Sequence, residues 1–207
     1  MRSVRGGSRR ISKEECNVWN FYDKRFHLYF MYGSNMNNEQ IHERCSRPEV
    51  FAAARLPDHR ISFHGYTRIW DGAEETVLPC VGEDTWGVVY KLTFSDAEKL
   101  DMMQDVRMDG AGRYFHYPVI VFDAVGRRLP ALTYKKDIVN APALPSAEYV
   151  EHIISGALFH GLPDEYVANL KRLETTKAGY VVPLRSKFDR FDLSCDCGGE
   201  ERPKERG

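Results

Sequence analysis

The chain has 207 residues, which fits one domain with additional terminal segments, because single domains commonly run to about 100–200 residues. Its 29 lysines and arginines nearly cancel its 30 aspartates and glutamates, and the net charge of −1 argues against a nucleic-acid partner. No apolar run approaches the roughly 18 residues of a membrane helix, so no membrane association is expected.

The cysteines are an odd number at scattered spacings, and no secretory signal precedes them. They indicate free thiols in a reducing compartment, so a cytoplasmic protein is expected. Cys195 and Cys197 are one residue too close for a C-x-x-C pair, and the histidines form no metal-ligand pattern. We therefore expect no metal. The five cysteines are Cys16, Cys45, Cys80, Cys195 and Cys197.

The terminal segments differ from the middle of the chain. Residues 1–25 begin with a basic, glycine-containing stretch, and residues 193–207 are polar, which predicts weakly ordered tails. No internal repeat, low-complexity linker or charge block divides residues 26–192. One domain is therefore predicted between the tails.

The first predicted elements are a strand and a helix. The aromatic run Phe26–Tyr32 predicts a buried strand that ends in a Gly-Ser-Asn loop. Asn37 and Gln40 stand at the spacing of a capping pair, so a helix with Ile41 on its covered side should follow.

The next part of the chain favours strands and then a short helix. Ser95 and Glu98 form a capping box, which predicts that the helix begins there. The strands before it are expected from their apolar patterns at Val50–Arg55, Arg60–Tyr66, Thr76–Val81 and Trp86–Phe94.

Strands resume at Arg113–Ala124 and Leu129–Lys135, separated by a glycine turn. A last helix is predicted at Ala147–Phe159, with Ser146 as its cap and Gly161 as its stop. Many strands with few helices, in no strict alternation, predict an α+β domain around a mostly antiparallel or mixed sheet.

The strand-to-loop junction at Tyr32–Met36 is the first candidate binding site. Gly33 lets the backbone turn sharply, and successive N–H groups in such a turn can converge on a carboxylate or phosphate. The helix expected just after it would add its positive N-terminal end. An ordinary turn would explain the same residues.

Gln104 is the second candidate, because it shares the inward side of the predicted helix with Ala97 and Leu100. A polar group there needs a partner from the protein or from a ligand. The alternative is a glutamine that caps backbone groups near the helix end. Asp101 and Asp105 rotate to flanking faces, where solvated carboxylates are expected.

Five segments, in order along the chain, resemble the γ-glutamyl cyclotransferase family. Residues 29–36 read YFMYGSNM and are similar to the family's aromatic strand and Y-G-S-N loop. Residues 86–90 read WGVVY, similar to its W-G-V-V strand, and Leu100-Asp101 resembles the opening of its L-D-x-x-E segment. The closing part of the family is matched by Ala141-Pro142, Tyr149 and the stretch from Gly161 to Tyr166.

The resemblance implies that residues 26–192 form a γ-glutamyl cyclotransferase-like domain, a small mixed β-barrel flanked by helices with the active cavity at the barrel's mouth. It implies an enzyme of the amidine-lyase or acyltransferase type that needs no cofactor. Such an enzyme releases 5-oxoproline and a free amine or peptide from a small-molecule γ-glutamyl substrate. Relatives form dimers, so the resemblance also implies a homodimer.

The resemblance further implies that the backbone of the aromatic strand and its loop cradles the γ-glutamyl head, and that tyrosines line the cavity. The family's acid/base is the glutamate of L-D-x-x-E, and counting from Leu100 puts Gln104 at that position. The substrate-binding residues expected on this ground are Tyr29, Phe30, Met31, Tyr32, Gly33, Ser34, Asn35, Tyr114, Tyr134 and Tyr149.

Gln104 is the main departure from the family pattern. A glutamine amide keeps the shape of a glutamate, but at neutral pH it neither accepts a proton nor returns one. We therefore predict that the chain binds γ-glutamyl compounds and turns them over slowly, with a loss of about 10²–10⁴-fold, the usual worth of a general base. An engineered change made to trap substrate is the first explanation, and a natural pseudoenzyme is the second.

The leaving group is left open by the sequence. Segments 107–112 and 70–75 are candidate rims for a bulky group, so one hypothesis is a glutathione conjugate, as in fungal secondary metabolite biosynthesis. A non-catalytic γ-glutamyl-binding protein and a γ-glutamyl-ε-lysine cyclotransferase are the alternatives.

Overall fold

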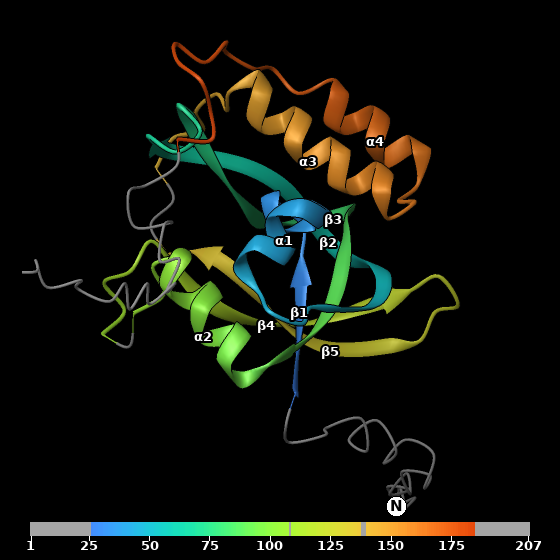
Figure 1. Ribbon diagram of the computed structural model, residues 1–207. Coiled ribbons are helices and arrows are strands. Elements are labelled where there is room, and N and C mark those ends of the chain that lie inside the picture. Colours follow the sequence, from blue (N-terminus) through green and yellow to red (C-terminus); the bar gives the residue numbers. More distant parts are fainter. Residues whose placement is uncertain (1–25, 108, 138–139, 185–207) are drawn as a thin grey trace, which may run out of the picture.

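The computed structural model describes residues 26–107, 109–137 and 140–184 (Figure 1). The tails predicted at 1–25 and 193–207 lie outside the described residues. In chain order the elements are β1 (Phe26–Met31), a 3₁₀ turn (Ser34–Met36), α1 (Asn38–Arg44), β2 (Glu49–Thr67), β3 (Gly72–Thr93), α2 (Phe94–Met103), β4 (Tyr114–Asp123), β5 (Arg128–Lys136), α3 (Ala147–Phe159) and α4 (Asp164–Lys171).

The strands close into a barrel in the order β1-β3-β2-β4-β5. β1 runs antiparallel to β3 and parallel to β5, where Tyr29 lies opposite Leu132, so the sheet is mixed. Figure 1 shows α3 and α4 packed together on one side of the barrel, with α2 on another. The predicted α+β fold, a small mixed barrel flanked by helices, is confirmed.

The first strand, β1, is apolar at almost every position because both of its faces are covered. Phe30 and Tyr32 pack into the cluster inside the barrel, while Tyr29 and Met31 pack into the cluster beneath the helices. A strand that is covered on both faces reads as a continuous apolar run. The end of β1 therefore lies between the two cores.

The predicted boundaries inside the two longest strands are wrong. The strands expected at 50–55 and 60–66 are one strand, β2, and those expected at 76–81 and 86–94 are one strand, β3. Between the two predicted parts of β2 the register with β3 shifts at an irregular bulge, where Asp58, with a φ of 54°, lies opposite residues 80–83. A bulge bends a strand without ending it, and pairing with β3 continues on both sides.

The predicted start of α2 is also wrong. The helix begins at Phe94 with Thr93 as its cap, so the box at Ser95 and Glu98 is not used. The Thr93 hydroxyl oxygen accepts a hydrogen bond from the Asp96 N–H at 3.2 Å and donates to the Asp96 carboxylate at 3.0 Å. Thr93 therefore caps the helix two residues before the predicted position, and the Asp96 carboxylate bonds the hydroxyl of this cap.

Asp96 favours the helix start at Phe94, because its carboxylate also accepts hydrogen bonds from the loop after α1. Its carboxylate accepts the backbone N–H groups of Ser46 at 2.7 Å and Arg47 at 3.2 Å. Burial by itself raises the pKa of this carboxyl, but the hydrogen bonds outweigh burial and hold the pKa of Asp96 below its usual value. The stabilisation from Asp96 is therefore present above the usual pKa and is lost as the pH falls.

The other predicted elements are confirmed. The Asn37 side chain caps α1 by accepting the Gln40 N–H at 3.1 Å, and Ser146 caps α3. β4 and β5 form the expected hairpin, with their pairing running from Tyr114 to Phe122 on β4. The sequence did not predict α4, which is a short helix that follows Pro163.

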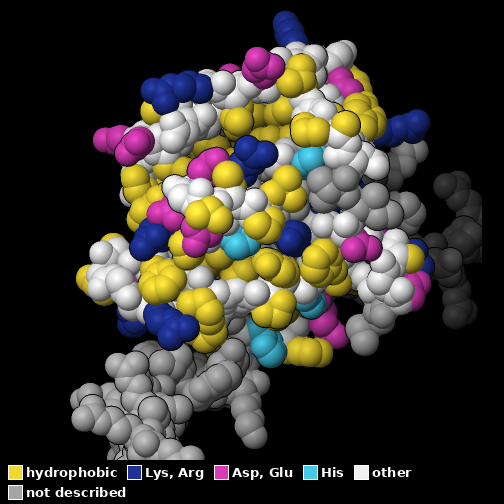
Figure 2. All heavy atoms as spheres, turned by 180° about the vertical axis from the view of Figure 1, so that it is seen from behind, with side chains coloured by type: hydrophobic (Ala, Val, Ile, Leu, Met, Phe, Trp, Pro, Cys, Tyr) yellow, Lys and Arg dark blue, Asp and Glu magenta, His cyan; other side chains and the backbone are white. Residues whose placement is uncertain are grey.

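The surface carries charges of both signs. On the face shown in Figure 2, acidic and basic side chains are interspersed among hydrophobic ones, and neither sign forms a continuous patch. Within residues 26–107, 109–137 and 140–184, no helix has the length and apolar character needed to cross a membrane.

We predict that Asp96→Ala lowers the free energy of unfolding by about 2–3 kcal/mol, because it removes the carboxylate bonded to the Thr93 cap and leaves two backbone N–H groups without an acceptor. Urea denaturation at neutral pH measures this loss. Glu98→Ala, at an exposed position of the same helix, is the control and should change stability by less than about 0.5 kcal/mol. Equal effects of the two substitutions would contradict the role of Asp96.

Candidate active site

The loop that follows β1 is fixed by helix α1. Ser34 and Asn35 are buried in the 3₁₀ turn, which the Met36 N–H closes by donating to the Gly33 carbonyl at 3.0 Å. The Asn35 side-chain oxygen accepts hydrogen bonds from Gln40 at 3.1 Å and from Arg44 at 2.8 Å. Two side chains of α1 therefore hold the loop in one conformation.

A cavity opens where this loop meets β3 and the end of α2. It encloses about 240 Å³ of empty space, part of it open to solvent. Its walls are formed by Phe30, Met31, Tyr32, Gly33, Asn35, Glu75, Gln104, Tyr114, Thr133 and Tyr134.

An adjoining hollow of about 340 Å³ shares three of these residues, Glu75, Gln104 and Tyr114. Its other walls are Ser34, Arg44, Ile69, Trp70, Glu74, Met103, Arg113 and Tyr149. The shared residues form the boundary between the two spaces. Together the hollows bring the β1 loop and the end of α2 into one site.

Most of the residues predicted for the site line one of these two hollows. The exception is Tyr29, which lies behind the wall, with its ring 5.7 Å from the Tyr134 ring and 5.9 Å from the His116 ring. Tyr29 therefore supports the cavity wall through Tyr134.

Gln104 lies at the C-terminal end of α2, where its backbone N–H donates to the Leu100 carbonyl at 2.8 Å. Its side chain faces both hollows. Among the residues that the structure describes, its amide has no hydrogen-bond partner. The alternative of a side-chain cap at the helix end is therefore not observed.

Asp101 is not the solvated carboxylate that the sequence predicted. Its Oδ1 accepts hydrogen bonds from the Tyr134 hydroxyl and from His116 Nε2, both at 2.8 Å. Burial and the charge of Asp101 raise the pKa of Tyr134, which keeps its proton and donates it to this carboxylate. Asp101 thus holds one tyrosine of the cavity wall. Because its partners come from β4 and β5, the helical pattern contained no sign of the contact.

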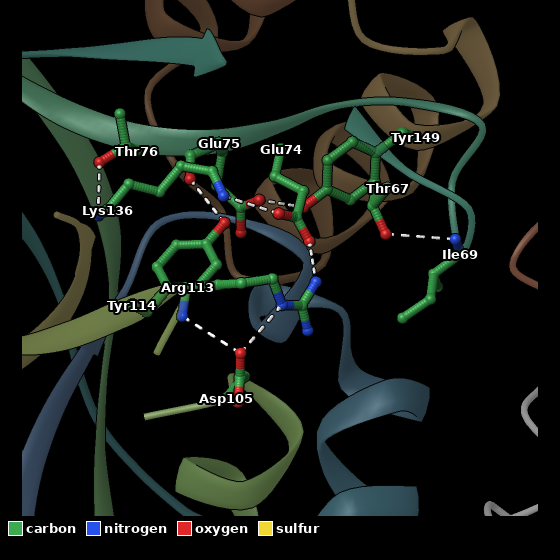
Figure 3. Close-up of polar contacts among 10 residues, drawn as sticks. All are labelled: Thr67, Ile69, Glu74, Glu75, Thr76, Asp105, Arg113, Tyr114, Lys136 and Tyr149. Atoms are coloured by element: carbon green, nitrogen blue, oxygen red, sulfur yellow. Dashed lines mark hydrogen bonds and ion pairs between the residues drawn. The ribbon is translucent and has the colours of Figure 1, made fainter. Parts of the chain in front are cut away.

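Two glutamates on β3 are the main residues that sequence reasoning missed. Glu74 and Glu75 belong to segment 70–75, which the sequence offered only as a candidate rim, but they are 8% and 7% exposed. Figure 3 shows Glu74 between two cations, with Lys136 Nζ at 2.7 Å from one oxygen and Arg113 Nη1 at 2.7 Å from the other. Arg113 also reaches Asp105, 3.7 Å from its Nε. The charge of Glu74 is therefore neutralised locally.

Glu75 makes no ion pair with any residue that the structure describes, and it is held by tyrosines. The Tyr149 hydroxyl donates a short hydrogen bond to its Oε2, and the Tyr114 hydroxyl donates to its backbone carbonyl at 2.8 Å. Burial raises the pKa of the Glu75 carboxyl, the Tyr149 hydrogen bond opposes that rise, and the charge of Glu74 adds to it. The net result is a buried carboxyl in the cavity wall with a raised pKa.

Trp70, the aromatic residue of the predicted rim, is also buried. It is 5% exposed and stacks on Tyr149, with ring centroids 4.5 Å apart. The segment predicted to be a rim therefore runs inward and orders the tyrosine that holds Glu75.

Gly33 is required for a different reason from the one expected. Its φ of −111° is open to residues with side chains, so the turn itself does not demand glycine. A Cβ atom at this position would lie 1.9 Å from Glu75 Oε1. Glycine is needed because the Glu75 carboxyl sits directly against the loop.

Known proteins match both the sequence and the fold. Residues 84–170 match the AIG2-like family. Human γ-glutamylcyclotransferase is 35% identical over 157 residues, which cover 73% of this chain and 81% of that protein. The bovine γ-glutamylcyclotransferase is 32% identical over 164 residues, covering 77% of this chain and 85% of that protein. A solved γ-glutamyl cyclotransferase structure superposes with a TM-score of 0.71 at 32% identity, covering 79% of this chain and 95% of that one.

The chain belongs to the γ-glutamylcyclotransferase family. The resemblance seen in its short motifs is confirmed by a match that extends over most of the chain. The Y-G-S-N loop of this family member borders a cavity, and Gln104 lines the same cavity together with Glu75.

We predict that Gly33→Ala lowers the free energy of unfolding by about 1–3 kcal/mol, the usual cost of overpacking, because the new methyl group meets the Glu75 carboxyl. In a Glu75→Ala background the same change should cost at least about 1 kcal/mol less, since the clashing group is gone. Denaturation of the four proteins in this cycle measures the coupling.

Gly179→Ala is the control, because its added Cβ would lie no closer than 3.4 Å to Asp71. It should change stability by less than about 0.5 kcal/mol. Additive costs for Gly33→Ala and Glu75→Ala would show that the two residues do not constrain each other.

Proposed function

We propose that this protein is a γ-glutamylcyclotransferase, which releases 5-oxoproline and a free amine or peptide from a small γ-glutamyl compound. The observation that carries the proposal is the cavity bounded by the Y-G-S-N loop and the position-104 side chain, in a chain that is 35% identical to the human enzyme. The β1 loop would bind the γ-glutamyl head, with the tyrosines of the wall around it.

The reaction needs little machinery because the substrate supplies both reacting groups. Its α-amine is the nucleophile and its γ-carbonyl is the electrophile, so the site has to fold the glutamyl chain into a five-membered ring. Well-aligned intramolecular attack can lower the barrier by about 7–11 kcal/mol. A rigid loop held by α1 is suited to this task.

Proton transfer is the remaining requirement. The α-amine arrives as an ammonium with three hydrogens, and the ring nitrogen of 5-oxoproline keeps one of them. Two protons must therefore pass from the attacking nitrogen to the departing nitrogen, which leaves as an ammonium. One group that is ionised before and after the reaction can carry both protons in turn.

The tyrosines of the site are unsuited to this carrier role. Burial raises the pKa of Tyr32, Tyr114 and Tyr149 well above the usual value, so their hydroxyls stay protonated at neutral pH. Each donates its hydrogen bond to a fixed partner in the protein, with the Tyr32 hydroxyl bonded to the Tyr134 carbonyl at 2.6 Å. They shape the cavity and support its walls.

The prediction of slow turnover stays a prediction. We propose that Gln104 occupies the position of the family's acid/base, which its place in the walls of both hollows supports. A non-catalytic γ-glutamyl-binding protein is the second candidate function, and the amide at position 104 favours it. The engineered and natural origins of that amide are both compatible with this proposal.

The location and assembly of the protein form part of the same proposal. A cytoplasmic enzyme is supported by the scattered cysteines, of which Cys45 and Cys80 are free thiols in the structure. A homodimer is carried over from the resemblance and can be tested by light scattering on the purified protein.

The test is a substrate panel of γ-glutamyl dipeptides, glutathione, glutathione conjugates and γ-glutamyl-ε-lysine. We expect 5-oxoproline and the free amine to appear in equal amounts, because each ring closure cuts one amide bond, and mass spectrometry quantifies both products. Binding without any release of 5-oxoproline across the panel would identify a non-catalytic binder. The substrate that reacts fastest identifies the leaving group.

The same assay on Gln104→Glu tests the prediction of slow turnover. If the amide at position 104 limits the rate, the variant should be faster by about 10²–10⁴-fold. Equal rates of the two proteins would show that residue 104 is not where the proton is carried.

A further inference from the structure

The cavity contains a carboxyl group that the family's sequence pattern does not include. Glu75 comes from the start of β3, and Gln104 comes from the end of α2, yet both line the same two hollows. The site therefore lacks a carboxyl at position 104 but has one on β3, facing the same space.

We propose that Glu75 is the catalytic proton carrier of this protein, acting from β3 in place of the carboxylate that Gln104 cannot provide. This inference rests on the proposed cyclotransferase function and names the residue that performs its proton transfer. The prediction of slow turnover assumes that only residue 104 can carry the proton. A carboxyl on β3 that lines the same cavity makes this assumption unnecessary.

The position of the two Glu75 oxygens fits this role. Oε2 is occupied by the Tyr149 hydroxyl, which fixes the orientation of the carboxyl group. Oε1 lies against the Gly33 backbone, in the loop where the γ-glutamyl head is proposed to bind. One oxygen is therefore held by the protein, while the other faces the proposed position of the substrate.

The charges around the cavity single out Glu75 among its acidic neighbours. Glu74 is held by two ion pairs, with Lys136 and Arg113, so its oxygens are already engaged. Within the described residues, Glu75 forms no ion pair. Lys136 acts on Glu75 only as a nearby charge, so an incoming ammonium could pair with its carboxylate directly, and the attraction would be strong in this buried setting.

Burial also raises the pKa of Glu75, which suits a group that has to accept a proton. A carboxyl with an ordinary pKa is a weak base for an ammonium, whereas a raised pKa improves acceptance of the proton and still allows its return. The raised pKa of Glu75 comes first from desolvation and then from the charge of Glu74, against the opposing Tyr149 hydrogen bond. A raised pKa suits a residue that first accepts a proton and then returns it.

The proton transfers then balance. The Glu75 carboxylate takes one proton from the α-ammonium, and the neutral amine forms a C–N bond with the γ-carbon. The protonated Glu75 gives that proton to the departing nitrogen as the amide C–N bond breaks. Glu75 carries a second proton from the ring nitrogen to the departing amine in the same way, so the carboxylate is restored and the amine leaves as an ammonium.

The decisive variants are Glu75→Gln and the exchange Glu75→Gln/Gln104→Glu. We expect Glu75→Gln to lower kcat by about 10²–10⁴-fold with little change in KM, since the shape is kept and proton transfer is lost. The exchange should regain at least about tenfold over Glu75→Gln, because it moves the carboxyl to the family's position. Glu83→Gln, at an exposed site on the same strand, is the control with unchanged rate.

The pH profile separates a proton carrier from a residue that only supports the fold. Activity of the wild-type protein should fall as the pH drops through the pKa of Glu75, because the carboxylate must be ionised to begin. Tyr149→Phe removes a hydrogen bond that lowers this pKa, so the acid limb of kcat/KM should move to higher pH. This measurement decides the matter even if Glu75→Gln fails to fold.

Stability gives an independent check. Because the folded protein raises the pKa of Glu75, stability should decline as the pH rises from the unfolded to the folded pKa of this group. Glu75→Gln removes that decline, so at neutral pH it should melt no lower than the wild-type protein. A stable Glu75→Gln with low activity supports the proposal.

Several outcomes would overturn the inference while leaving the proposed function intact. A Glu75→Gln variant with wild-type kcat, or an acid limb that Tyr149→Phe does not move, removes Glu75 from proton transfer. A faster Glu75→Gln would mean that the carboxylate occupies the substrate's place beside Gly33 and blocks it. Absence of 5-oxoproline release by the wild-type protein across the whole panel would instead contradict the proposed function itself.

Discussion

The close contact between the Glu75 carboxyl and the backbone of Gly33 is the constraint on which the site depends. It joins the start of β3 to the loop that follows β1, and it tolerates no side chain at Gly33. Tyr149 on α3 and Trp70, in the turn before β3, hold the other side of the carboxyl. A buried carboxyl is tolerated when its surroundings supply hydrogen bonds or when its pKa rises so that it keeps its proton more readily, and Glu75 shows both the Tyr149 hydrogen bond and a raised pKa.

Buried and half-buried polar groups join the barrel and its helices at several further points. Asp96 ties α2 to the loop after α1, Asp101 ties α2 to β4 and β5, and Glu74 ties β3 to β5 through Lys136. Such groups are costly in an apolar interior unless each finds a partner, so they favour one arrangement of the elements over its competitors. The cavity walls are therefore set by polar contacts between elements as much as by apolar packing.

The family fold of this protein is compatible with a proton carrier on β3, as we propose, as well as at position 104. The barrel superposes on a solved γ-glutamyl cyclotransferase over most of its length, while position 104 carries an amide and β3 carries a carboxyl. An intramolecular ring closure places its main demand on substrate shape, and a proton carrier can serve from more than one wall of the same cavity. A change of carrier therefore requires no change of fold.

The sequence by itself determined the fold class, most element positions and the Y-G-S-N loop, because these depend on local periodicity, capping and short motifs. It placed Ser95 as the cap of α2 and Asp101 in solvent, and it split β2 and β3, because caps, bulges and solvation depend on partners far away in the chain. Only the tertiary structure brought Glu75 to Gly33. A residue that reads as surface charge in a strand becomes a buried acid only when other elements close over it.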